Sequence, residues 1–540
     1  MRIAIRFLLV FMLLFTESSV YAHQRYVDYD LQFFEYSNDP CFHIHLKSEF
    51  DRSGKQNLLI PLGGRDFKVK TDAQEIPLEP AKAFHTTQII GSPHSEYSIE
   101  YNHCIKNPYV VPKLPIVEDD FFTVKFVDVL ITPIDHSHSK WKISVKTWLP
   151  TNFKLASSLF MKDNKIEINK TLYDFKYSMI TGGKNLRIKN TNIGGRPITI
   201  VSDGHFGGLS KHPEGYVELL TQAHQKFWQD NNTEHLMVTL VGPACENVFS
   251  TIEGLYYENA FVMKIPNCKN IPTYESSTKY SLSHELFHGW IGKKIKFVNQ
   301  KNPIVWFYEG YNDYYGMLFA YTTGLITLDE YIDFYNKFIR LYYISPFKHY
   351  SNDQIAEILE RDQSIRNLAQ TRGHLMAKEQ AYLLSQKDRS LDEILRAIYL
   401  KSRGSKKPLT NLDLHDMFHQ YLDASQWQSF NAIINDGKEL EISKDLFGPG
   451  VKLVQKELEV PDYGFDYKTF LLTRTIVGLK NNSAAYKAGL REGQKVDFHS
   501  LPETNPTEEA IMGWIESNKN REVRFFPEKR KVKIPQYIMK

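Results

Sequence analysis

The hydrophobic pattern changes along the chain from a strand period to a helical period, and this order restricts the fold most strongly. Up to about Gly204, β-branched and aromatic residues cluster or alternate between Pro, Gly, Asn and Asp, which is typical of strands. The clearest such segments are 44–50, 122–132, 141–148 and 198–201. Strands followed by helices are typical of α+β domains.

Helical patterns dominate the second half of the chain. A first helical period at 219–230 is followed by strand signals at 236–241 and 260–265, and helices then prevail from about 280 to 422. The last segment returns to short strands, with one helix expected near 507–518. We find no internal repeat.

These changes divide the chain into four parts. We predict a signal peptide over 1–22, an N-terminal β domain over 23–204, a mostly helical domain over 205–444 and a β-rich domain over 445–540. The fold class is therefore multidomain α+β.

The N-terminus has the features of an export signal. Arg2 and Arg6 precede an apolar run over 7–15, and small residues precede His23, so we expect cleavage after Ala22. A retained anchor is the alternative, but it needs about 20 apolar residues. With the signal removed, we expect an exported protein without a transmembrane anchor, either periplasmic or secreted.

The four cysteines fit an oxidising compartment. Of the three possible pairings we favour Cys41 with Cys104 and Cys245 with Cys268, because each pair then lies within one predicted domain. No CxxC pattern is present, so these cysteines are expected to be structural and not metal ligands.

The overall charge gives no sign of a polyanionic partner. The 66 basic and 63 acidic side chains nearly cancel and leave a formal charge of +3. Such a balance creates no general field that would attract nucleic acid, and we expect no nucleic-acid partner.

A metal-binding pattern lies in the segment HELFH at 284–288. Residues four apart share one face of a helix, so His284 and His288 are able to bind one zinc ion at about 2.0 to 2.1 Å. Glu285 is rotated about 100° from His284, which suits a general base that activates water and not a ligand.

Glu309 is the predicted third ligand. The segment VWFYEGY at 305–311 leads into a second helix, which could bring a carboxylate to the two imidazoles and leave the fourth position open. The alternative is a helix-start acid favoured by the macrodipole. A single zinc ion per chain with a Glu285 base makes peptide hydrolysis the natural reaction class.

With these motifs, the chain resembles the gluzincin metallopeptidases, and among them the glycyl aminopeptidase family. HELFHGW at 284–290 is similar to the HExFHxW of that family, and WFYEGYNDYY at 306–315 to its W-x-x-EG-x-x-x-YY. The similarity runs from about residue 140 to the end. It implies a thermolysin-like catalytic domain over 205–444 that acts on peptide or protein substrates.

One position departs from the family. Related enzymes carry a tyrosine in Y-x-K-G that holds the oxyanion, whereas this chain has QTRG at 370–373. Losing one such donor costs about 10² to 10³ in rate. Gln370 or His374 is expected to donate instead, and the alternative is that both only pack on the helix or face solvent.

A second family feature concerns the amino end of the substrate. Aminopeptidases of this clan carry a strand whose glutamate is expected to bind the free α-amine, and GLYYEN at 254–259 lies at a similar distance before the zinc helix. Glu258 and Asn259 are the substrate-binding candidates. A plain carboxylate at a strand end is the alternative for Glu258.

The C-terminal segment resembles a PDZ domain. NSAAYKAGLREG at 482–493 is similar to the PDZ segment of small residues followed by AGL, and Tyr463-Gly464-Phe465 to the loop that receives a peptide C-terminus. A peptide C-terminus is therefore a possible partner, and a purely structural lid is the alternative.

Three functions compete at this point. The leading one is an exported zinc aminopeptidase acting on peptides with small N-terminal residues. The second is a zinc endopeptidase that uses the same ligands. The third is a catalytically weak peptide-binding scaffold, which the missing oxyanion tyrosine favours and the complete set of ligands opposes.

Overall fold

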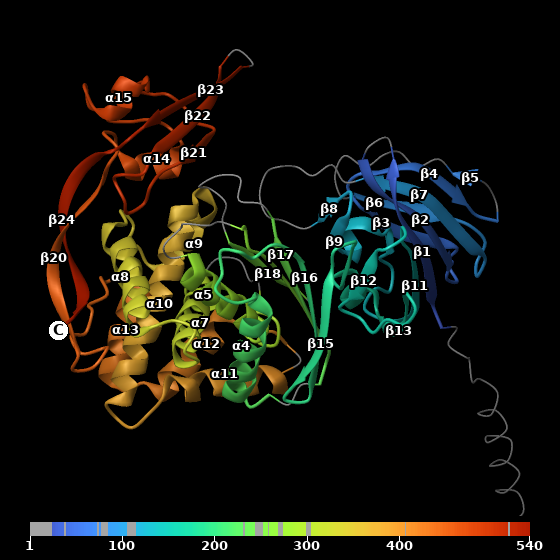
Figure 1. Cartoon of the computed structure of the whole chain (residues 1–540), viewed down its shortest axis with the longest axis horizontal. Coiled ribbons are helices and arrows are strands. Elements are labelled where there is room, and N and C mark those ends of the chain that lie inside the picture. The colour runs from blue at the N-terminus through green and yellow to red at the C-terminus, as the bar shows by residue number, and fades with distance from the viewer. Residues whose placement is uncertain are drawn as a thin grey trace, which may run out of the picture.

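The computed structural model describes residues 24–36, 39–72, 75–76, 85–104, 115–230, 233–243, 252–257, 259–267, 274–298, 304–405, 407–516 and 519–540. The predicted signal peptide, the second cysteine pair and Glu258 lie outside these residues. No helix among the described residues is both long and apolar enough to cross a membrane. The multidomain α+β architecture with an N-terminal β-rich region and a helical middle region is confirmed (Figure 1).

A seven-stranded sheet forms the largest layer of the N-terminal region, in the order β13-β11-β1-β2-β7-β4-β5. Its strands are β1 (Tyr26–Tyr36), β2 (Asp39–Glu49), β4 (Gly64–Lys70), β5 (Glu75–Ile76), β7 (Glu96–Cys104), β11 (Lys140–Trp148) and β13 (Lys165–Thr171). In β11, Trp141, Ile143 and Val145 are buried, while Lys140, Lys142 and Lys146 are exposed on the other face. This alternation is what places one face of a strand in the core.

Two smaller sheets complete this region, together with the short helices α2 (Phe126–Val129) and α3 (Leu172–Lys176). They are β10-β3-β6 and β12-β14-β9-β8. Their strands are β3 (Lys55–Ile60), β6 (His85–Ile90), β8 (Ile116–Glu118), β9 (Phe121–Lys125), β10 (Thr132–Pro133), β12 (Lys154–Ser157) and β14 (Met179–Gly183). The strand expected over 122–132 is confirmed only in its first part, β9, because α2 interrupts it at Phe126. A short continuous apolar run fits a buried strand and a buried helix equally well, so its periodicity does not distinguish the two.

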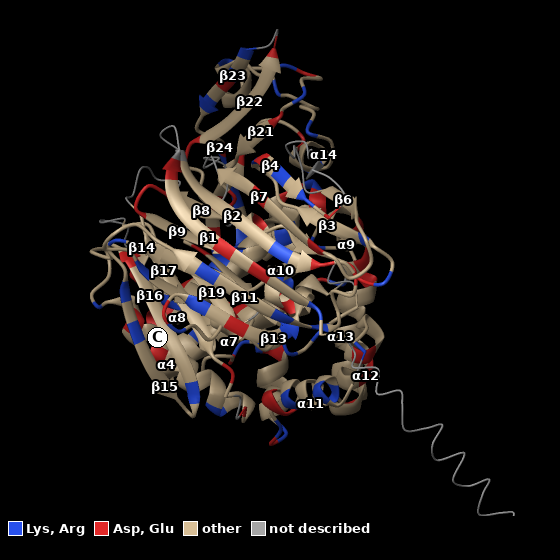
Figure 2. Ribbon diagram, turned by 90° about the vertical axis from the view of Figure 1, so that its right-hand side faces the viewer, with Lys and Arg blue, Asp and Glu red and all other residues tan. Residues whose placement is uncertain are grey.

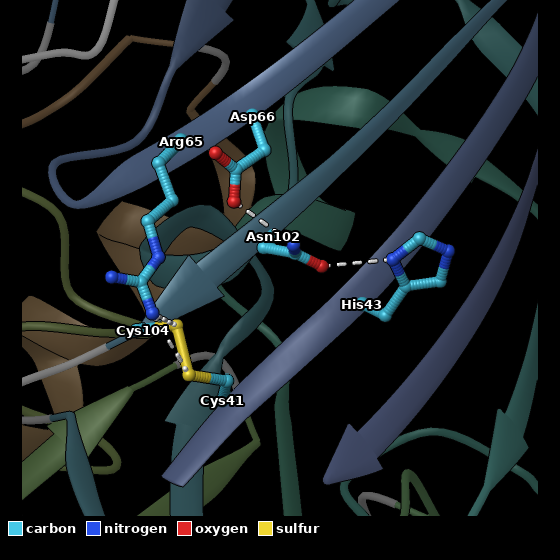
Figure 3. The surroundings of a disulfide bond; sticks show 6 residues. All are labelled: Cys41, His43, Arg65, Asp66, Asn102 and Cys104. Atoms are coloured by element: carbon cyan, nitrogen blue, oxygen red, sulfur yellow. Dashed lines mark hydrogen bonds between the residues drawn. A yellow bond between two sulfur atoms is a disulfide. The ribbon is translucent and has the colours of Figure 1, made fainter. Parts of the chain in front are cut away.

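The predicted disulfide between Cys41 and Cys104 is confirmed. The two residues stand directly opposite each other in the pairing of β2 with β7. Arg65 from β4 donates a hydrogen bond to Cys104 Sγ at 2.7 Å (Figure 3). This bridge fastens the ends of two neighbouring strands.

A five-stranded sheet connects the β region to the helices, in the order β15-β16-β17-β19-β18. Its strands are β15 (Arg187–Ile193), β16 (Arg196–Gly204), β17 (Leu236–Gly242), β18 (Glu253–Tyr257) and β19 (Ala260–Lys264). Helix α4 (Pro213–Trp228) connects β16 to the parallel strand β17. In this sheet β18 is the last strand, so one of its edges is not paired with another described strand.

The helical region follows, and its described residues form no further strand up to residue 436. Its elements are α5 (Tyr274–Phe287), α6 (Val305–Tyr308), α7 (Gly310–Thr322), α8 (Leu328–Ile344), α9 (Asn352–Ile358), the 3-10 turn η1 (Leu359–Arg361), α10 (Gln363–Ser385), α11 (Leu391–Gly404), α12 (Asn411–Tyr421) and α13 (Ala424–Asp436). Figure 2 shows basic and acidic residues interspersed over the ribbon, in line with the small net charge.

The C-terminal region contains a long ribbon and a small sheet. Strands β20 (Val451–Asp462) and β24 (Glu528–Met539) pair with each other, and β21 (Phe498–Ser500), β22 (Ala510–Glu516) and β23 (Lys519–Phe525) form the sheet. Helices α14 (Tyr467–Thr473) and α15 (Ala484–Ala488) lie beside it (Figure 1).

The helix expected over 507–518 is wrong, because Ala510–Glu516 forms β22. Pairing with β23 decides the structure, since tertiary context overrides local pattern. Gly513 contributes to this arrangement, because a Cβ atom there would lie 2.0 Å from the Phe498 ring on the neighbouring strand.

Asp362 connects the C-terminal region to the helices. This buried carboxylate accepts hydrogen bonds from the Ser364 backbone N–H at 2.8 Å and from His499 Nε2 on β21 at 2.8 Å. Arg474 Nη1 forms an ion pair with Asp362 Oδ2 at 2.5 Å. Burial alone would raise its pKa, but the hydrogen bonds of His499 and Ser364 lower the pKa of Asp362 to about 2.

We predict that Asp362→Asn lowers the free energy of unfolding by about 2 kcal/mol at pH 7, because a carboxylate with a depressed pKa stabilises the fold above its unfolded pKa of about 4. This advantage of the wild type should shrink as pH falls towards about 2. Urea unfolding midpoints at pH 7 and pH 3 measure it. Asp353→Asn, at an exposed position on α9, is the control; equal midpoints for wild type and Asp362→Asn at pH 7 would refute the prediction.

Candidate metal centre

His284, His288 and Glu309 come together at the junction of α5 and α7. The two Nε2 atoms lie 3.1 Å apart, and each lies 3.4 Å from Glu309 Oε2. Among the described residues, these three side chains form the group that could hold a metal ion.

Helix geometry explains this meeting. His284 and His288 lie one turn apart around the C-terminal end of α5, and Glu309 immediately precedes α7. The two helices pack closely because Gly316 of α7 has no side chain: a Cβ atom there would lie 2.9 Å from the backbone nitrogen and Cα of His284.

The three ligand atoms fit a zinc ion. Tetrahedral coordination with bonds of about 2.0 to 2.1 Å requires neighbouring ligand atoms about 3.3 Å apart, and the observed separations of 3.1 and 3.4 Å agree with this value. Two imidazoles and one carboxylate are also the donor set of open catalytic zinc sites. Burial alone would raise the pKa of Glu309, but the two histidines lower this pKa. The carboxylate is therefore ionised.

Glu285 lies beside the ligands on the next position of α5. A Cβ atom on Gly254 of β18 would lie 2.3 Å from Glu285 Cγ and 2.9 Å from its Oε1, so the carboxylate is held against this edge strand. Burial raises the pKa of Glu285, and a raised pKa makes this carboxylate a better proton acceptor.

Each histidine is oriented through its second ring nitrogen. His284 Nδ1 lies 2.7 Å from Asp313 Oδ1, and His288 Nδ1 lies 3.2 Å from the Ile291 carbonyl oxygen. Such partners fix the tautomer that presents Nε2 to a metal. The buried Asn312 also touches His288 Nδ1, and its Oδ1 has no partner among the described residues. If Oδ1 and Nδ2 of Asn312 exchange places, Oδ1 accepts a hydrogen bond from the Nδ1–H of His288.

Gln370 does not stand free at the site. Its Nε2 donates a hydrogen bond of 2.6 Å to Asp313 Oδ2, and the Tyr280 hydroxyl donates to the other oxygen of the same carboxylate. Gln370 is thus linked through Asp313 to His284. This geometry favours a positioning role over the expected contact with an oxyanion.

His374 is enclosed in the helical core. Its ring is fully buried and stacks on Phe338 with a centroid distance of 4.2 Å. Burial lowers its pKa to about 4, so the imidazole is neutral. This enclosure argues against the expected contact with the oxyanion and favours packing.

Asn259 is engaged by neighbouring side chains. Its Oδ1 accepts from Arg196 at 3.4 Å, and its Nδ2 donates to Glu234 at 3.3 Å. The residue has a positive φ of 49°, a conformation that asparagine tolerates well. Its side chain therefore holds the turn between β18 and β19.

The tryptophan of the HELFHGW segment has a structural partner. Trp290 Nε1 donates a 2.8 Å hydrogen bond to Asp230, which also pairs with Lys294. These contacts fix the turn that follows His288.

Sequence reasoning missed Asp313 and Gly254. Asp313 follows Glu309 by four residues, so helical spacing places it one turn further on the same face, and this signal was available. Gly254 carried no such signal, because only the packing of β18 on α5 reveals its contact with Glu285.

Comparison with known proteins confirms the resemblance to the glycyl aminopeptidase family. Residues 278–393 match the profile of the M61 glycyl aminopeptidase family. An aminopeptidase N family protein from Idiomarina loihiensis has a similar fold, with a TM-score of 0.68 and 13% identity over 94% of this chain and 98% of that chain. An M1 zinc metallopeptidase from Deinococcus radiodurans reaches a TM-score of 0.50 and 14% identity over 78% of this chain and 96% of that chain. No curated protein sequence matches significantly.

We predict that Gln370→Ala weakens zinc binding about tenfold, because Asp313 loses a partner that holds it against His284. Competition with a chromophoric chelator measures this affinity. Gln386→Ala, at the exposed end of α10, should change nothing. A loss of kcat of about a hundredfold with unchanged zinc affinity would instead support the oxyanion role of Gln370.

Proposed function

We propose that this chain is an exported zinc aminopeptidase that removes small residues from peptide N-termini. Its residues 278–393 match the M61 glycyl aminopeptidase family. The observation that carries the proposal is the group His284, His288 and Glu309, with ligand atoms 3.1 to 3.4 Å apart, directly beside Glu285. One zinc ion per chain fits this donor set.

Glu285 carries the proton transfers in this proposal. His284, His288 and Glu309 would hold a zinc ion, which would supply Lewis-acid chemistry at the scissile carbonyl and lower the pKa of water. The Glu285 carboxylate accepts the proton of the attacking water and delivers it to the leaving amine. Asp313 keeps His284 in position during these steps.

Strand β18 supports a peptide as the substrate. Its outer edge has no strand partner among the described residues, and its Gly254 touches Glu285. An extended peptide that pairs with such an edge gains main-chain hydrogen bonds and passes beside the general base.

The preference for a free amino terminus rests on Glu258. We assign this residue, one position after the end of β18, to binding the α-amine of the substrate. Asn259 is assigned to holding the turn, because Arg196 and Glu234 already engage its side chain. The preference for small residues follows from the resemblance to the glycyl family.

The C-terminal domain enters the proposal as a structural element. A peptide C-terminus added to a PDZ-like domain needs an exposed strand beside the loop 463–465, but α14 begins at Tyr467. Tyr463 is buried and its hydroxyl donates to the Pro502 carbonyl oxygen at 2.6 Å. These contacts favour the lid over capture of a peptide end.

We predict that the protein expressed from residue 23 onwards binds one zinc and releases amino acids from peptides with free N-termini but not from N-acetylated ones. Glu285→Gln should retain zinc and lose at least about a thousandfold in kcat, because the water loses its base. Glu393→Gln, an exposed helix position, is the control. Cleavage of blocked peptides would favour the endopeptidase, and zinc without any turnover would favour the scaffold.

Export is tested separately. We predict that the full-length chain made in a bacterial host is recovered outside the cytoplasm with His23 as its first residue, because a signal peptidase cleaves after small residues. Edman sequencing of the fractionated protein measures this. Recovery of uncleaved chain in the membrane fraction would favour the anchor.

A further inference from the structure

A cavity of about 210 Å³, lined by none of the metal ligands, lies between the C-terminal half of α10, α13 and the segment 438–443. A water molecule takes about 30 Å³ in the liquid, so the space suits a ligand of roughly one amino-acid residue. Its apolar wall is formed by Met376, Leu383, Leu422, Phe430, Ile433 and Leu440.

Gln380 is an unsatisfied polar group in the wall of this cavity. The side chain is 6% exposed, and its Nε2 has no hydrogen-bond partner in the described part of the chain. Its Oε1 accepts from the Tyr311 hydroxyl, which fixes the amide. A buried donor left without a partner costs about 1 to 3 kcal/mol, and a ligand with an acceptor would remove this cost.

Glu379 places a carboxylate in the same wall. Its two oxygens accept from the backbone and the hydroxyl of Ser443 at 2.9 and 2.6 Å. No ion pair with Glu379 forms among the described residues, because the Lys378 ammonium lies over the Phe447 ring, 4.6 Å from its centroid. Burial raises the pKa of Glu379 to about 7, and a cation beside it would stabilise the ionised form.

The rim of the cavity adds to the negative charge. Glu439 and Glu441 also line the cavity, and Lys438 is the one basic residue among the lining residues. Glu439 is paired with Lys348 at 2.7 Å outside the cavity. A ligand that brings its own positive charge is therefore favoured over an anion.

We propose that this cavity binds a small primary amine with an apolar body and a hydrogen-bond acceptor next to the amine, as in the free amino end of one amino-acid residue. The ammonium group faces Glu379, the acceptor faces Gln380 Nε2, and the apolar body packs on Phe430 and Ile433. Tyr311 connects this cavity to α7, two residues after Glu309. The inference is independent of the proposed peptidase activity, because it uses none of the metal ligands.

Calorimetric titration of the zinc-loaded protein with L-leucinol tests the proposal. L-leucinol carries the ammonium, an oxygen acceptor and an apolar side chain, and it has no bond that a peptidase hydrolyses. Ile433→Trp fills the cavity and should weaken binding at least tenfold, and Gln380→Leu, which removes the donor, about tenfold. N-acetyl-L-leucinol, which lacks the charge, should bind the wild type at least tenfold more weakly.

The controls separate this cavity from the metal centre. Leu400→Trp, on the exposed face of α11, should bind L-leucinol like the wild type, and so should protein stripped of zinc. Circular dichroism verifies that the variants fold, and Glu379→Gln replaces Ile433→Trp if the larger residue disrupts the core. Binding that persists unchanged in the cavity variants, disappears with zinc, or is absent from the wild type at tens of millimolar amine would overturn the proposal.

Discussion

The close contact of α5 with α7 is the constraint on which the metal centre depends. Two histidines on one helix become a three-ligand site only if a second helix brings Glu309 within about 3.4 Å of them. Gly316 permits this approach of α7 to the backbone of His284. Gly373 permits a similar approach of α10 to the segment just before α7, because a Cβ atom on Gly373 would lie 1.7 Å from the Trp306 carbonyl oxygen. Close packing transmits even small changes in volume, so the ligand geometry is a property of three helices together.

Much of this arrangement could be read from the sequence because it rests on local spacing. The positions of His284 and His288 follow from the helical period, and the strands 141–148 and 236–241 follow from alternation or continuous apolar runs. The Cys41–Cys104 pairing followed from the domain division. In each case the signal lies within a few residues or within one predicted domain.

Other features depend on distant contacts that no local pattern encodes. His374 was expected at the site, but its burial is decided by Phe338 on another helix. Gln370 was read as an oxyanion donor, whereas its partner Asp313 lies 57 positions earlier in the chain. A helix is expected over 507–518, but Ala510–Glu516 forms a strand through pairing with β23. Such cases mark where tertiary contacts override propensity.

The ribbon of β20 and β24 has a consequence for the order in which the molecule assembles. Asn336 of α8 bonds through its side chain to both the backbone N–H and the carbonyl oxygen of Tyr537, each at 2.8 Å across 201 positions of sequence. Contacts so distant in sequence form late, since a long loop must close first. One face of α8 is thus covered only after β24 has been synthesised, and until then the helical core lacks this cover.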